Sequence, residues 1–110
     1  MSTAIVTAES ITAGLELARG AAEAMYNKIG ERDACGFGWT EVYVDRTNSK
    51  QAQELIKAGF KKSYKPKCLD YWDPAKLPTQ SISVKEAGAD AFATYLQALG
   101  LKAYGCSRMD

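Results

Sequence analysis

The N-terminal part of the chain carries hydrophobic residues at alternating spacings of four and three, which is the period of an amphipathic helix. The pattern predicts one helix over residues 7–30, with Thr7 as N-cap and Gly30 as its C-terminal stop. The apolar stripe consists of Ile11, Leu15, Ala18, Ala22, Met25 and Ile29. Gly14, Gly20 and several alanines make the helix thin, so it is expected to lie close to another surface.

Between Gly36 and Asp45 the pattern changes to strict alternation, which predicts a β-strand. One face of this strand is modestly apolar and consists of Thr40, Val42 and Val44. The other face is aromatic and acidic and consists of Trp39, Glu41, Tyr43 and Asp45. A strand divided in this way belongs to a sheet that is covered on one side.

The rest of the chain alternates between helical and extended patterns. The predicted elements are a helix over about 49–58, strands over 60–64 and 68–72, a helix from Ser83 to Gly100 and a strand over 101–106. Gly59 ends the first of these helices, and a capping box formed by Ser83 and Glu86 opens the second. Residues 75–81 are expected to form a surface loop and residues 107–110 a polar tail.

Strand–helix–strand repeated twice is the order of a ferredoxin-like fold. We therefore expect a single α+β domain over residues 1–110, with a ferredoxin-like βαββαβ antiparallel sheet over 36–106 and an additional N-terminal amphipathic helix over 7–30. Right-handed crossovers would place the two later helices on one face of the sheet. The N-terminal helix is then expected on the aromatic face, where Trp39 and Tyr43 would be its buried contacts; the alternative is that this helix forms a dimer interface.

Composition limits the classes of function. Hydrophobic residues make up 46% and charged residues 25% of the chain, which is ordinary for a globular protein. The formal net charge is only +1, whereas a dedicated duplex-DNA binder is normally more basic. No apolar run approaches a membrane span, and the N-terminus lacks the pattern of a signal peptide. Three widely spaced cysteines favour a reducing cytoplasm.

The sequence lacks the usual residues of catalysis. It has no histidine, no Gly-rich phosphate loop and no serine in a nucleophile-elbow context, so we expect neither an enzyme nor a cofactor. The sequence contains no CxxC motif that would support a zinc site formed by its three cysteines. These cysteines are expected to be small, semi-buried hydrophobic residues: Cys35, Cys68 and Cys106. Four carboxylates are expected to be solvated rather than to bind a cation: Glu41, Asp45, Asp70 and Asp73. No metal site is predicted.

The most concentrated basic feature is the hairpin between the second and third predicted strands. Aromatic residues beside charge are typical of protein contact surfaces. The predicted partner-binding residues are Lys61, Lys62, Tyr64, Lys65, Lys67, Tyr71 and Trp72. The competing interpretation is an edge strand that its lysines protect against aggregation.

An alternative is a domain that binds single-stranded RNA or DNA, because a ferredoxin-like sheet with aromatic residues on an open face has the architecture of an RNA-recognition motif. The predicted contacts are Trp39, Tyr43, Trp72, Lys102 and Tyr104. Against it, the third strand, CLDYWD, lacks the RNP1 consensus, and the carboxylates of Glu41 and Asp45 would repel phosphate. A second alternative is a small-ligand sensor that dimerises; the sequence leaves monomer and homodimer open.

Three segments carry a resemblance to known proteins: CGFGW at 35–39, KEAGADAF at 85–92 and AYGCSRMD at 103–110. Together they resemble small uncharacterised proteins encoded by tailed bacteriophages, over roughly residues 34–110. The resemblance implies a class: phage accessory proteins that bind a host enzyme or a defence component, of which anti-CRISPR proteins are the best-known example. It leads us to expect a non-enzymatic protein that modulates a host protein in the cytoplasm of an infected bacterium.

Overall fold

The computed structural model describes residues 5–30 and 33–109. In these ranges the chain forms three helices and a four-stranded antiparallel sheet, which confirms the predicted α+β class. The elements in chain order are α1 (Ala8–Ile29), β1 (Gly36–Tyr43), α2 (Lys50–Ala58), β2 (Lys61–Lys62), β3 (Cys68–Trp72), α3 (Ile82–Ala98) and β4 (Lys102–Met109). The strands lie in the order β2-β3-β1-β4, so β1 and β3 are central and β2 and β4 are the edges.

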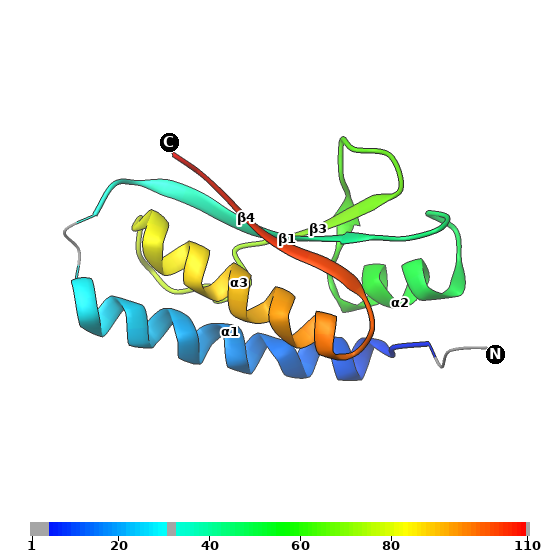
Figure 1. The fold of residues 1–110 in the computed structure, drawn as a ribbon, viewed down its shortest axis with the longest axis horizontal. Coiled ribbons are helices and arrows are strands. Elements are labelled where there is room, and N and C mark those ends of the chain that lie inside the picture. Colours follow the sequence, from blue (N-terminus) through cyan, green and yellow to red (C-terminus); the bar gives the residue numbers. More distant parts are fainter. Residues whose placement is uncertain (1–4, 31–32, 110) are drawn as a thin grey trace.

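All three helices lie on the same side of the sheet (Figure 1). α3 packs against β1 and β4, and α1 packs against α3 and, over a smaller area, against α2. The prediction that α1 covers the aromatic face of the sheet is therefore wrong. The apolar stripe of α1 is buried or partly buried, but its main partner is the outer surface of α3. Trp39 and Tyr43 are consequently not covered by this helix.

Local signals place the first two helices as predicted. The Thr7 side chain accepts a hydrogen bond from the backbone N–H of Ser10, and the Ser49 side chain accepts one from Ala52. Gly59 ends α2 with φ of 120°, a conformation in which a side chain would be strained. These helix ends depend on residues within a few positions of each other, and sequence patterns detect such contacts well.

The N-terminus of α3 differs from the prediction. Its cap is Ser81, and the capping box of Ser83 and Glu86 does not form. The carboxylate of Asp33 accepts a hydrogen bond from Ser81 Oγ at 2.6 Å and another from the backbone N–H of Ser83 at 2.7 Å. Hydrogen bonds from Ser81 and Ser83 lower the pKa of Asp33 to about 2. A residue about fifty positions away in the chain thus decides where α3 begins.

The two edge strands also differ in length from the prediction. The expected polar tail after Cys106 is part of β4, because Ser107, Arg108 and Met109 pair with the beginning of β1. The lysine-rich strand is shorter than expected and is reduced to Lys61–Lys62. One edge of the sheet is therefore long and the other very short.

The core lies between the sheet and α3. Phe92 is fully buried, with its ring centroid 5.9 Å from that of Phe60 and 5.4 Å from that of Tyr71. The same ring also lies against Gly14 of α1. Phe92 therefore joins α1 and α3 to β3 and to the segment that follows α2, and the absent side chain of Gly14 lets α1 approach.

The two glycines of α1 should respond oppositely to alanine. A Cβ at Gly14 would lie 2.5 Å from Tyr95 Cδ2 and 2.9 Å from Phe92 Cδ1, whereas a Cβ at Gly20 would meet nothing within 4 Å. We expect Gly20→Ala to raise the free energy of unfolding by about 0.5–1 kcal/mol through helix propensity. Gly14→Ala should lower it by about 1–2 kcal/mol, because overpacking exceeds the same propensity gain. Urea unfolding of the two variants checks this, and equal effects would contradict the packing of α1 on α3.

Candidate functional site

The face of the sheet that points away from the helices carries most of the aromatic residues named above. Residues directly opposite each other in antiparallel strands share a face. Trp39 of β1 pairs with Trp72 of β3 and with Cys106 of β4, and Tyr43 pairs with Cys68 and Lys102. We call this surface the open face; its members are Phe37, Trp39, Glu41, Tyr43, Lys61, Cys68, Asp70, Trp72, Lys102, Tyr104, Cys106 and Arg108.

The structure brings together all five residues of the predicted nucleic-acid set. The indole rings of Trp39 and Trp72 stack, with centroids 4.6 Å apart and an interplanar angle of 22°. Tyr43 and Tyr104 meet edge to face at 5.9 Å. Trp72 and Tyr104 remain 46% and 52% exposed, so each presents ring surface to a ligand.

Sequence reasoning missed Phe37, which also belongs to this aromatic group. Its ring lies edge to face with Trp72 at 6.4 Å, and the guanidinium carbon of Arg108 lies 5.5 Å from its centroid. The signal was present in the sequence, because Phe37 has the same parity as Trp39 within one strand. The aromatic group thus covers two ends of the open face: Phe37, Trp39 and Trp72 at one, and Tyr43 and Tyr104 at the other.

A buried carboxylate lies between these two aromatic groups. Glu41 is only 2% exposed and accepts hydrogen bonds from Trp39 Nε1 at 3.1 Å and from Tyr43 Oη at 3.3 Å. Lys65 reaches from the β2–β3 connection, and its Nζ donates to both carboxylate oxygens of Glu41, at 2.9 and 3.1 Å. Burial acts to raise the pKa of Glu41, but the bonds and charge of Lys65, with the bonds from Trp39 and Tyr43, outweigh it and hold the pKa below its usual value.

Glu41 therefore orients both aromatic groups and is itself neutralised. The side chain of Lys65, which the sequence assigned to a partner-binding hairpin, lies folded onto the open face instead. The expected repulsion between Glu41 and a phosphate backbone is offset by this ion pair. Asp45, the other acid expected on the aromatic face, lies beyond the end of β1 and is exposed.

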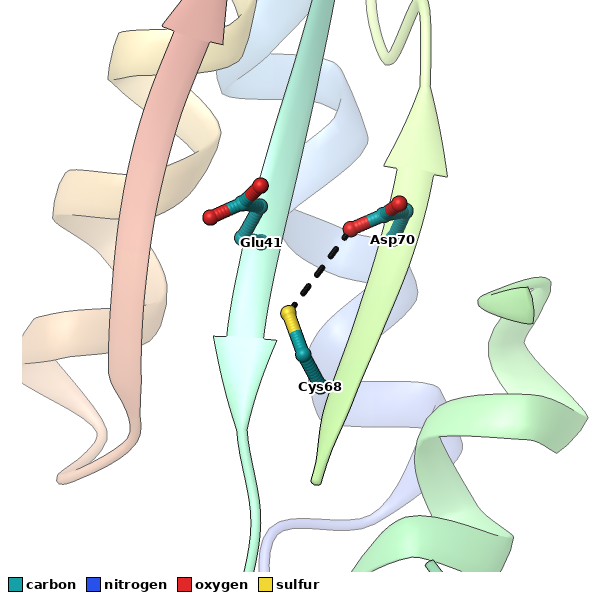
Figure 2. Close-up of side chains that lie close together, drawn as sticks. All are labelled: Glu41, Cys68 and Asp70. Atoms are coloured by element: carbon teal, nitrogen blue, oxygen red, sulfur yellow. Dashed lines mark hydrogen bonds between the residues drawn. The ribbon is translucent and has the colours of Figure 1, made fainter. Parts of the chain in front are cut away.

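Three potential metal ligands also meet on the open face (Figure 2): Glu41, Cys68 and Asp70. Their ligand atoms all lie within 4.8 Å of one another, and Cys68 Sγ lies 3.8 Å from Asp70 Oδ1. Burial raises the pKa of Cys68 and of Asp70, which favours their neutral forms. Lys65 already contacts both oxygens of Glu41, so a cation would have to displace it. Glu41 is bonded to Lys65 and Cys68 to Asp70, and the residues fit these hydrogen bonds better than a metal centre.

The hairpin residues do not form one surface. Tyr64 is 90% exposed, and Lys62 and Lys67 are exposed beside it. Tyr71, in contrast, points toward the helices and is 8% exposed, with its ring packed on Phe60 and Phe92. Tyr71 is a core residue and has to be removed from the predicted partner-binding set. Lys61, Lys65 and Trp72 of that set lie on the open face.

Comparisons with known proteins add no relative. No family model matches the chain, and no curated protein or solved structure shows significant similarity to it. Among the helices of the described ranges, none is long and apolar enough to cross a membrane. The functional argument therefore depends on the geometry of the open face.

Proposed function

We propose that the protein binds single-stranded RNA or DNA on the open face of its sheet. The observation that carries this proposal is the position of α1, which packs on α3 and leaves Trp39, Trp72 and Tyr104 uncovered by any helix. Exposed aromatic rings on a sheet stack with unpaired bases, and such stacking tolerates any sequence because every base has a π-face.

We further propose a ferredoxin-like architecture for residues 36–109, which the chain order of the elements and the strand order β2-β3-β1-β4 support.

Charge on the open face also suits a nucleic acid. Cations at its borders outnumber its two carboxylates; they are Lys61, Lys65, Lys102 and Arg108. Glu41 is paired with Lys65, and burial raises the pKa of Asp70 above its usual value. A bound strand would place its bases over Trp72 and Tyr104 and its phosphates near Lys102 and Arg108. The absence of an RNP1 motif fits binding with little sequence preference.

Tryptophan fluorescence tests the proposal directly. The chain contains two tryptophans, Trp39 and Trp72, and both lie on the open face. An oligothymidylate of about 12 nucleotides should quench their emission, and the logarithm of the apparent association constant should fall linearly with the logarithm of the salt concentration. A duplex of the same length is the control and should quench less, because its bases are already stacked. Absence of salt-sensitive quenching by the single strand would refute the proposal.

A second candidate function is a phage accessory protein that binds a host protein through the β2–β3 hairpin. The observation that favours it is the exposure of Tyr64, which is 90% accessible and has Lys62 and Lys67 nearby. A tyrosine so exposed contributes little to folding, and aromatic residues of this kind often anchor interfaces. The hairpin rises from the sheet on the side away from the helices (Figure 1), so a partner could reach it without contacting α1.

A further inference from the structure

The outer edge of β4 has backbone groups that no strand of the described ranges pairs with. β1 bonds to β3 through its even-numbered residues: Asp73 N donates to Gly38 O at 2.8 Å, and Val44 N donates to Lys67 O at 2.9 Å. In an antiparallel strand the N–H and C=O of one residue point to the same neighbour, and successive residues alternate. The odd-numbered residues of β1 therefore bond to the even-numbered residues of β4.

It follows that the odd-numbered residues of β4 direct their N–H and C=O groups away from the sheet. They are Ala103, Gly105, Ser107 and Met109. One side-chain contact agrees with this orientation: Gln97 Nε2 donates to the backbone oxygen of Ala103 at 2.6 Å. The other outward groups of Gly105 and Ser107 are available to a further strand.

The two edges of the sheet differ in protection. β2 is two residues long, carries lysines at both positions and is followed by Pro66, all of which discourage pairing with another chain. β4 is eight residues long and contains no proline. An unprotected edge of this length is a template for strand addition.

The side chains beside this edge carry opposite charges on its two faces. On the open face, Lys102 and Arg108 are exposed near the two ends of β4. On the helix face, the carboxylate of Glu86 accepts a hydrogen bond from Ser107 Oγ at 2.5 Å, and Asp90 lies directly against Gly105. A strand that pairs with β4 thus meets cations on one side and anions on the other.

We propose that the outer edge of β4 binds an extended segment of a partner protein in which acidic and basic side chains alternate. Its acidic residues would lie on the open face, near Lys102 and Arg108, and its basic residues on the helix face, near Glu86 and Asp90. Backbone hydrogen bonds to Gly105 and Ser107 supply the affinity, and the charge pattern selects the partner. The backbone edge is separate from the ring faces that stack with bases, and only Lys102 and Arg108 are common to both proposals, so this one goes beyond nucleic-acid binding.

A second copy of the chain is a poorer occupant. Two copies that pair antiparallel through β4 are related by a two-fold axis perpendicular to the sheet, which brings like faces together. Lys102 and Arg108 would then lie beside the same cations of the other copy, and Glu86 and Asp90 beside the same anions. Like charges directly opposite each other in a sheet are destabilising.

Amide hydrogen exchange by NMR tests the proposal on the whole protein. The probe is the capped peptide Glu-Lys-Val-Lys-Thr-Val-Glu, and the control is its charge-exchanged form Lys-Glu-Val-Glu-Thr-Val-Lys. In the free protein the amides of Gly105 and Ser107 should exchange faster than those of Tyr104 and Cys106, which pair with β1. A probe concentration of about ten times Kd should slow the amides of Gly105 and Ser107 about tenfold.

The variant with Lys102→Glu and Arg108→Glu should lose the preference for the probe over the control peptide, because both substitutions are on exposed side chains and reverse the charge of one face only, so that each peptide then matches one face and is repelled by the other. Equal protection of the parent protein by the two peptides, or protection by neither, would overturn the proposal. Protection of the Gly105 and Ser107 amides in the free protein that increases with protein concentration would also overturn it, since the occupant would then be a second copy.

Discussion

Replacing Trp72 by alanine is expected to weaken the binding of a single-stranded oligonucleotide by roughly 5- to 150-fold. This range corresponds to the loss of about 1–3 kcal/mol, which is the usual contribution of one aromatic side chain that stacks with a base. Trp72 is the residue to change because its ring is 46% exposed and also stacks on Trp39 at 4.6 Å. Removing it deletes one stacking surface and leaves the ring of Trp39 without its neighbour.

Two further variants make this result interpretable. Trp72→Phe keeps a flat ring at the same place and should restore most of the affinity. Tyr64→Ala removes the most exposed aromatic residue of the β2–β3 hairpin and should leave nucleic-acid affinity unchanged. Fluorescence anisotropy of a labelled oligothymidylate measures all three, with thermal unfolding as the check on folding.

The opposite pattern would favour the second candidate function. If Trp72→Ala binds the oligonucleotide as the parent does, stacking on Trp72 is excluded. If Tyr64→Ala instead abolishes capture of a host protein while Trp72→Ala does not, the hairpin is the functional surface. The two proposals therefore make different predictions for the same pair of variants.

Replacing Phe92 by alanine is expected to lower the free energy of unfolding by about 3–5 kcal/mol. The side chain is fully buried, and its ring contacts Phe60, Tyr71 and Gly14, which lie in three separate parts of the chain. The loss includes the transfer of the ring to water and the cavity that remains between α1, α3 and β3. A domain of this size has little stability to spare, so such a variant should be close to unfolding at 37 °C.

Phe37→Ala is the matched control for this prediction. Phe37 has the same side chain, but it lies on the open face and is only partly buried, so its loss should destabilise the protein less. Urea unfolding followed by circular dichroism gives both free energies. Equal losses would contradict the assignment of Phe92 to the centre of the core.

Some features of the candidate site were predictable from the sequence because they depend on the alternation of a single strand. The parity of Gly36–Asp45 places Trp39, Glu41 and Tyr43 on one face, and the register of the sheet keeps them there. The same parity would have identified Phe37. Tyr71 and Trp72 are adjacent in one strand, so alternation alone assigns them to opposite faces, and the predicted hairpin surface combined residues that a strand has to separate.

Other features arise only from contacts between distant residues. Lys65, in the β2–β3 connection, forms an ion pair with Glu41 of β1. This pairing neutralises the carboxylate that was expected to repel phosphate and that holds the aromatic rings. The cap of α3 depends on Asp33, and the full length of β4 depends on the beginning of β1. Patterns of neighbouring residues contain no information about such partners.

The sequence by itself determined the three helices, the apolar stripe of α1 and the ends of the first two helices, because helix period and capping are properties of adjacent residues. It also determined which side of β1 is aromatic. Only the tertiary structure decided what the stripe of α1 covers. A hydrophobic stripe specifies that a face is buried, whereas the partner depends on competing surfaces, and here α3 offers a place where Gly14 fits against Phe92 and Tyr95. That choice leaves the aromatic face of the sheet open to a ligand.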